Sequence, residues 1–255
     1  MKRFAPVLLT AVALAFGVAP AGAILGGQPD GTNHPYVGVV TDFEFVCSGG
    51  AVSPTRFITA AHCFETGPGT PVAVFFGPDG FDDPAGFVTG TWWPHPGWCQ
   101  ECAHGLVGFD LNDVAVVILD ESPELDEYGK LPALGQAAAQ PQKQSVSLVG
   151  YGIQDRLKTL DPDELFTRHF APAELVQSNN RISSDFLKVS GNHSQGKGGG
   201  CLGDSGSPII LEGAGEGNDT FLGATSFGTN VNCAGHGYAQ RLDIPAALNF
   251  INSVN

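Results

Sequence analysis

Apolar residues in this chain recur mainly in short alternating runs, the spacing of strands in which every second side chain is buried. Glycine (35 residues) and proline (18 residues) separate these runs, and only 15% of the chain is charged. This combination is typical of many short strands joined by turns. Strands are predicted at 34–40, 43–52, 72–76, 87–93, 114–119, 145–152, 208–211, 220–227 and 238–242.

Two stretches lack this alternation, and they divide the predicted strands into groups. Residues 125–144 are interpreted as a crossing between two halves of the chain. Residues 153–180 carry charges together with Pro162 and Pro172, and are predicted to form a long surface loop. The end of the chain has apolar residues at helical spacing, which predicts a short helix containing Ile244, Leu248 and Ile251.

The amino terminus has the pattern of a secretory signal peptide over residues 1–23. Lys2 and Arg3 give a positive start, residues 7–18 are apolar, and Ala21-Gly22-Ala23 is a small-residue cleavage site. The apolar run is too short to span a bilayer. We therefore expect a secreted protein, extracellular or periplasmic. The net charge of −14 makes nucleic acids and anionic membranes unexpected partners.

Three polar residues stand where nucleophilic catalysis would need them. Ser205 lies between glycines in the run Gly200–Pro208, which suits a hydroxyl exposed on a tight turn. His62 ends an apolar run and could act as the base that takes the serine proton. Asp113 opens the apolar run 114–119 and could hold the imidazole, with Asp110 as the rival carboxylate.

The order His62, Asp113, Ser205, each in its matching local context, resembles the chymotrypsin-like (trypsin-like) serine protease family. The resemblance implies an all-β fold of two six-stranded antiparallel β-barrels with the active site between them and a short C-terminal helix. The barrels would occupy residues 24–133 and 134–255. It also implies a monomeric serine endopeptidase without cofactor or metal, acting on polypeptides and open to protein inhibitors.

The same resemblance assigns further roles. The backbone N–H groups of Gly203 and Ser205 would form an oxyanion hole. A freed amino terminus at Ile24 would insert and pair with Asp204. Since almost no room remains for an activation peptide, we expect signal removal itself to free Ile24. The expected disulfides are Cys47 with Cys63 and Cys201 with Cys233.

Substrate specificity is less defined. Gly199 stands where trypsin-like members carry an aspartate, so a Lys or Arg residue before the cut (P1) is not expected. Gly200 and Gly228 would leave the pocket open for an apolar residue, and Ser226-Phe227-Gly228 resembles the strand that pairs with the substrate. His236 leaves three alternatives: it fills the pocket and restricts it to small residues, it binds an acidic P1 residue, or it lies on a surface loop.

Two other classes of function remain as alternatives to a serine protease. His95, Cys99, Cys102 and His104 have metal-ligand types and spacing, although an oxidising compartment favours a Cys99–Cys102 disulfide. A zinc hydrolase is disfavoured because the chain lacks a His-Glu-x-x-His helix. A catalytically silent homologue that binds a protein partner is disfavoured by the complete set of site residues.

Overall fold

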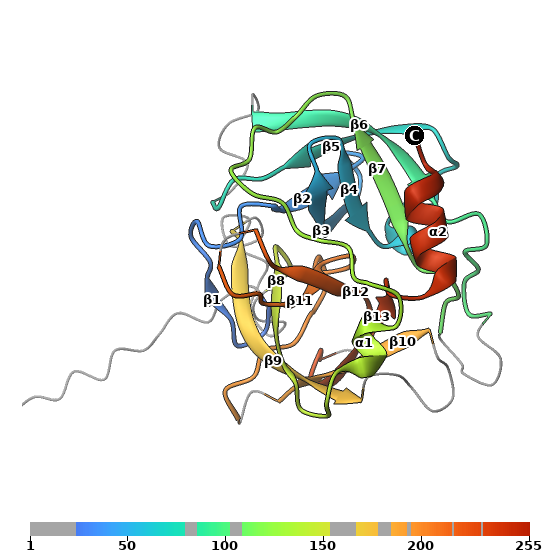
Figure 1. The fold of residues 1–255 in the computed structure, drawn as a ribbon. Helices are drawn as coiled ribbons and strands as arrows, with labels where there is room; N and C mark the ends of the chain where they lie inside the picture. Colours follow the sequence, from blue (N-terminus) through green and yellow to red (C-terminus); the bar gives the residue numbers. More distant parts are fainter. Residues whose placement is uncertain are drawn as a thin grey trace, which may run out of the picture.

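Two antiparallel barrels make up the molecule and lie one above the other in Figure 1. This computed structural model describes residues 24–79, 86–102, 109–153, 167–177, 185–192, 195–215, 217–230 and 232–255. The predicted signal peptide, residues 1–23, lies outside the described residues.

The first barrel is closed by six strands, in the order β2-β3-β4-β7-β6-β5. Side chains such as those of Val39, Phe57, Val116 and the large Trp92 are buried in its interior. Burial of these apolar groups is the main stabilising contribution. The strands are β2 (Val37–Thr41), β3 (Val46–Ser53), β4 (Arg56–Thr59), β5 (Thr70–Phe75), β6 (Phe87–Pro94) and β7 (Ala115–Leu119).

The second barrel closes when β8 pairs with β9, which completes the ring β9-β10-β13-β12-β11-β8. The two-residue strand β1 (Gln28–Pro29) pairs with β9. The predicted fold of two six-stranded antiparallel barrels is thereby confirmed, whereas the boundary at 133/134 stays a prediction. The strands are β8 (Ser145–Gly150), β9 (His169–Gln177), β10 (Phe186–Gly191), β11 (Pro208–Leu211), β12 (Thr220–Gly228) and β13 (Gly235–Arg241).

The prediction that residues 153–180 form a surface loop was wrong for their second part. Strand β9 lies there, and Ala171, Ala173 and Leu175 point into the core. Pro172 lies opposite Ser147 of β8, and its carbonyl accepts the Gly198 N–H on the other side of the strand. On that side β10 pairs only from Glu174 onward, so the strand tolerates a residue without an N–H there.

In the described ranges, two α-helices accompany the barrels. The predicted crossing at 125–144 contains a short one, α1 (Gln136–Ala139), and the predicted C-terminal helix is α2 (Pro245–Ser253). Helix α2 follows the second barrel but packs on the first, where Phe250 lies 4.8 Å from the His95 ring (Figure 1). None of the described helices is long and apolar enough to cross a membrane.

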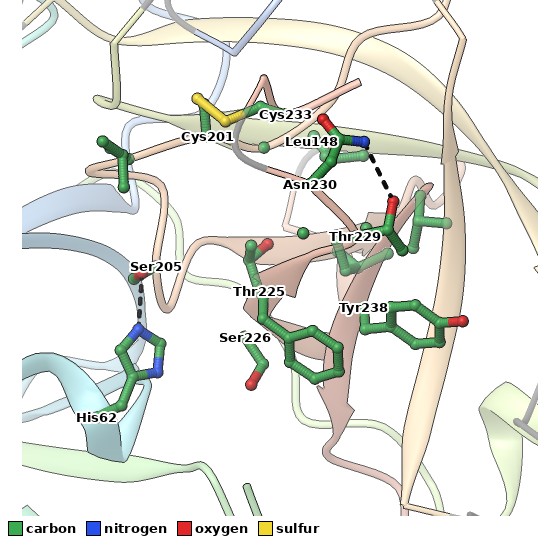
Figure 2. Close-up of a pocket in the computed structure, with 17 residues that line it drawn as sticks. His62, Leu148, Cys201, Ser205, Thr225, Ser226, Thr229, Asn230, Cys233 and Tyr238 are labelled. Atoms are coloured by element: carbon green, nitrogen blue, oxygen red, sulfur yellow. Dashed lines mark hydrogen bonds between the residues drawn. A yellow bond between two sulfur atoms is a disulfide. The ribbon is translucent and has the colours of Figure 1, made fainter. Parts of the chain in front are cut away.

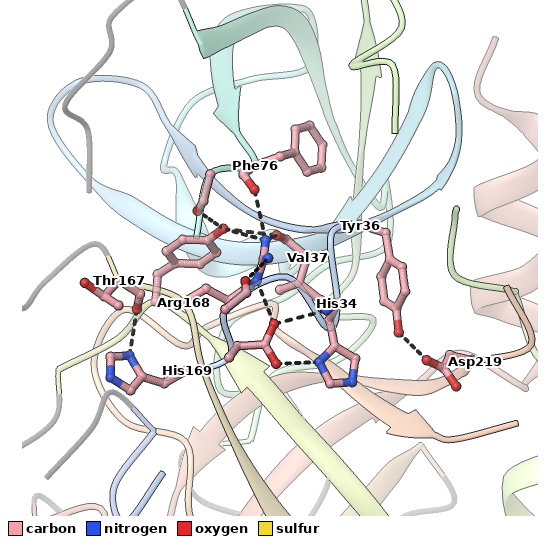
Figure 3. Close-up of polar contacts among 12 residues, drawn as sticks. His34, Tyr36, Val37, Phe76, Thr167, Arg168, His169 and Asp219 are labelled. Atoms are coloured by element: carbon pink, nitrogen blue, oxygen red, sulfur yellow. Dashed lines mark hydrogen bonds and ion pairs between the residues drawn. The ribbon is translucent and has the colours of Figure 1, made fainter. Parts of the chain in front are cut away.

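A buried ion pair lies where the entry segment meets both barrels (Figure 3). Arg168 directly precedes β9, is 1% exposed, and donates from Nε to Asp30 at 2.9 Å. Asp30 also contacts His34 Nδ1 at 2.6 Å. Burial raises the pKa of Asp30, but the hydrogen bonds and charges of His34 and Arg168 outweigh it and lower that pKa. The carboxylate therefore stays ionised although it is buried.

The remaining donors of Arg168 reach the first barrel, the entry segment and the end of β8. Its Nη1 donates to the carbonyls of Val37 and Phe76, at 3.1 and 2.9 Å, and to the Tyr151 hydroxyl at 3.3 Å. Its Nη2 donates to the Gly31 carbonyl at 2.7 Å. We call Asp30, His34, Tyr151 and Arg168 the inter-barrel cluster.

Candidate active site

His62 reaches the space between the barrels from a single turn of helix. This turn, η1 (Ala61–Cys63), follows β4 directly, and a disulfide joins Cys63 to Cys47 on β3. The His62 ring bonds at both nitrogens: Nδ1 lies 2.8 Å from Asp113 Oδ2, and Nε2 lies 2.8 Å from Ser205 Oγ. The three predicted triad residues therefore form one continuous hydrogen-bonded chain.

Asp113 is fully buried and receives several donors. The His62 backbone N–H donates to its Oδ1 at 2.9 Å, and the Ser226 hydroxyl donates to its Oδ2. Burial raises the pKa of Asp113, but the charge and hydrogen bonds of His62 and the bond from Ser226 lower it overall. An ionised carboxylate at this place fixes the imidazole with Nδ1 as donor, which leaves Nε2 free to accept the serine proton.

The contact between His62 and Asp113 also shifts the pKa of His62. Burial lowers it, but the charge and hydrogen bond of Asp113, with a further contribution from the charge of Asp110, raise it above the ordinary value. Asp110, the rival carboxylate, lies beside His62 but bonds elsewhere, to the backbone N–H of Glu101 and the indole N–H of Trp98.

Ser205 sits on a tight loop that leads into β11. Gly203 has a φ of +92°, a conformation that residues with a Cβ rarely adopt. In the part of the chain that the structure describes, the N–H groups of Gly203 and Ser205 donate to no protein acceptor. Two unpaired donors beside the serine hydroxyl could bind the negative oxygen of a tetrahedral intermediate.

A cavity of about 480 Å³ opens next to Ser205. Figure 2 shows His62 and Ser205 on one side of it, with the Cys201–Cys233 disulfide and Tyr238 on other sides. None of the described residues that line it is Asp, Glu, Lys or Arg. The cavity therefore suits an apolar side chain, since burying an unpaired charge there would be costly.

Four of the predicted substrate-binding residues line this cavity, and two do not. Gly200, Ser226, Phe227 and Gly228 are among the lining residues. Gly199 instead pairs through its backbone with Leu25. His236 is exposed and lies opposite Ser190 on β10, while Gly237 and Tyr238 face the cavity.

Comparison with known proteins agrees with this geometry. The family model described as Trypsin matches residues 24–251. The chain belongs to the trypsin family. Comparison with curated proteins gave no match.

Asp204 of this trypsin-family chain is the expected partner of a freed Ile24. Asp204 is fully buried and accepts the N–H groups of Cys201 and Gly152, each at 2.9 Å. A Cβ on Gly152 would lie 2.5 Å from Asp204 Cγ, which explains the glycine there. In the described ranges no cation pairs with Asp204, and burial raises its pKa to about 7. Ile24 itself is buried, one residue before the Leu25–Gly199 bridge.

The four candidate metal ligands of this trypsin-family chain do not form a metal site among the described residues. Cys99 and Cys102 form a disulfide, His95 packs on Phe250, and His104 lies outside the described residues. Among described residues, the side chains that could hold a metal together are His62, Asp110 and Asp113. Both nitrogens of His62 already bond within the chain from Asp113 to Ser205, so proton transfer is the better interpretation.

Sequence reasoning missed Ser48, which connects the serine loop to the first barrel. Its hydroxyl donates to the Gly203 carbonyl at 2.8 Å and accepts the Tyr151 N–H at 3.0 Å. Its own N–H donates to the Ser205 carbonyl at 2.8 Å. No sequence signal indicated this role, because the partners are more than one hundred residues away.

Replacing Ser48 by alanine should leave the Tyr151 N–H and the Gly203 carbonyl without this partner. We expect the free energy of unfolding to fall by about 1–3 kcal/mol and kcat to fall about tenfold, because the oxyanion donors lose their support. Ser53→Ala, at the far end of the same strand, is the control. A loss of stability with unchanged kcat would show that Ser48 does not position the loop.

Proposed function

We propose that this chain is a secreted serine endopeptidase that cleaves after apolar residues. The observation that carries the proposal is the hydrogen-bonded chain Asp113–His62–Ser205 beside an uncharged cavity. Ser205 Oγ attacks the scissile carbonyl carbon while His62 Nε2 takes its proton. The N–H groups of Gly203 and Ser205 stabilise the oxyanion, and His62 then gives the proton to the leaving amine.

The resulting acyl-enzyme is hydrolysed when His62 takes a proton from an attacking water. Residues 226–228 of β12 support substrate binding in an extended form. They pair with β13 on one side, whereas β11 pairs only as far as Ala224, which leaves the other side of this segment as an edge in the described structure. A peptide can add to such an edge through backbone hydrogen bonds.

The composition of the cavity lining supports an apolar P1 residue. Among the described residues, the lining holds no Lys or Arg for an acidic side chain, and His236, the alternative acid-binding residue, lies outside it. It also holds no carboxylate for Lys or Arg. Secretion is supported by the pattern of residues 1–23 and by the three disulfides, which persist in oxidising compartments.

A fluorophosphonate probe tests the reaction class. Intact mass should show one adduct per chain, located on the peptide that contains Ser205 and absent from Ser205→Ala. Peptides that differ only at P1 should then give at least tenfold higher kcat/KM for Phe or Leu than for Glu or Lys, since one unpaired buried charge costs more than that factor. Absence of any adduct would favour the catalytically silent homologue, and preference for Glu would contradict the apolar pocket.

A further inference from the structure

Asp110 is a carboxylate at the active site that the proposed reaction does not use. It offers an oxygen that lies within 4.8 Å of ligand atoms of both His62 and Asp113. Asp113 is fully buried and already holds Nδ1 of His62, whereas Asp110 is only partly buried. In the described part of the chain no Lys or Arg pairs with Asp110.

The residue before Asp110 locates it relative to the substrate strand. The ring of Phe109 lies 4.2 Å, centre to centre, from that of Phe227, which belongs to β12 and lines the cavity. Phe109 also contacts Tyr238, at 5.0 Å. Residues 109–110 therefore border the active site between the His62 imidazole and the edge of β12.

An extended peptide places successive side chains on opposite sides. If P1 enters the cavity, the side chain of the preceding residue, P2, must point away from it, toward His62 and the Phe109–Asp110 border. Among the described residues, the carboxylates beside His62 are the fully buried Asp113 and the partly exposed Asp110. Lys188 lies over Tyr238, a neighbour of Phe109, 5.9 Å from the centre of the Tyr238 ring, and does not pair with Asp110. The oxygens of Asp110 accept two N–H donors but meet no full positive charge.

We propose that Asp110 forms an anionic subsite that binds a Lys or Arg side chain at P2. The preferred substrate would thus carry a cation directly before an apolar residue. This inference rests on the proposed function. Since the pair stays partly exposed to solvent, its expected contribution to kcat/KM is about two- to fivefold. It should weaken with salt, because the screening length falls to a few ångströms near 1 M.

Matched peptide pairs test the subsite. Both peptides have Phe at P1, one has Arg at P2, and the other has citrulline, which keeps the shape of arginine without its charge. For the wild-type chain we expect the Arg peptide to give about fivefold higher kcat/KM at 0.05 M NaCl, with a ratio near one at 1 M. Asp110→Asn should show a ratio near one at both salt concentrations.

Glu121→Gln is the matched control, because it removes the same charge from an exposed position beyond the far end of β7. It should keep the wild-type ratio. A ratio that persists in Asp110→Asn, or a wild-type ratio of one at low salt, would overturn the proposal. If Asp110→Asn shifts the acidic limb of the pH profile but not this ratio, Asp110 acts on His62 alone, which also overturns it.

Fluorophosphonate titration of every sample distinguishes failure of the protease function from failure of the Asp110 subsite. An unlabelled wild-type chain would refute the proposed protease function. A labelled chain that does not discriminate between the Arg and citrulline peptides would refute only the subsite.

Discussion

Replacement of Asp113 by asparagine is expected to lower kcat by about 10⁴-fold. The carboxylate accepts three donors: the His62 backbone N–H, the His62 Nδ1–H and the Ser226 hydroxyl. An asparagine side chain has one acceptor oxygen, and its NH₂ group must face at least one of these positions. The imidazole then favours the tautomer with its proton on Nε2, and that nitrogen can no longer accept the proton of Ser205.

The measurement is kcat with a peptide substrate at pH 8, with the melting temperature as a check that the variant folds. Asp110→Asn is the informative control, because Asp110 lies beside the same imidazole. A loss of less than tenfold in Asp113→Asn, together with a large loss in Asp110→Asn, would transfer the orienting role to Asp110.

The second large effect concerns the amino terminus. A chain that begins at Ile24 is expected to be active, whereas one that keeps Gly22 and Ala23 should lose about 10³-fold or more in kcat. In the longer chain the Ile24 nitrogen belongs to a neutral amide, so it offers no positive charge to the buried Asp204. The Gly203 and Ser205 donors flank Asp204, and loss of one such donor typically costs 10²–10³-fold.

The same two chains should also differ in their free energy of unfolding, by an amount that depends on pH. With Ile24 still linked, the pKa of Asp204 is raised from 3.8 to about 7. The folded state then binds the proton more tightly than the unfolded state, so stability falls as the pH rises from about 4 to 7, by roughly 4 kcal/mol. A charged Ile24 amino group offsets this cost. The chain from Ile24 should therefore melt at a higher temperature at pH 8, and the difference should shrink toward pH 4.

Asp204→Asn in both chains completes the test, because asparagine carries no charge for the amino group to pair with. The melting temperatures of these two variants should differ little at pH 8. Equal activity and equal melting of the two unsubstituted chains would show that Ile24 and Asp204 do not form a pair.

The parts of the site that were predictable have local sequence signals. Ser205 and His62 stand in short stretches whose residue types match their chemistry, and Asp113 directly precedes a buried strand. The first barrel was predictable because its strands are rich in valine and aromatic residues. Strand β9 was missed because its inward positions include two alanines, which are weak hydrophobic signals, and because Pro172 indicated a loop.

The remaining site features depend on contacts between distant residues. Ser48 could be recognised only once β3 lay against the serine loop, 155 residues further along the chain. The position of His236 stayed open among three alternatives, because it depends on the pairing of β12 with β13, which shifts register between Thr225 and Phe227. A one-residue shift exchanges the two faces of a strand, and no local pattern in this stretch reveals it.

The inter-barrel cluster has a consequence for how the two halves unfold. All six cysteines are paired within one barrel or its loops, so no disulfide joins the barrels, and the chain crossing at 125–144 connects them. Arg168 belongs to the second barrel, but its acceptors include carbonyls of the first barrel and the carboxylate of the entry segment. Separating the halves would leave this guanidinium without most of its partners. The two barrels should therefore melt in a single cooperative transition, and neither half expressed alone should be stable.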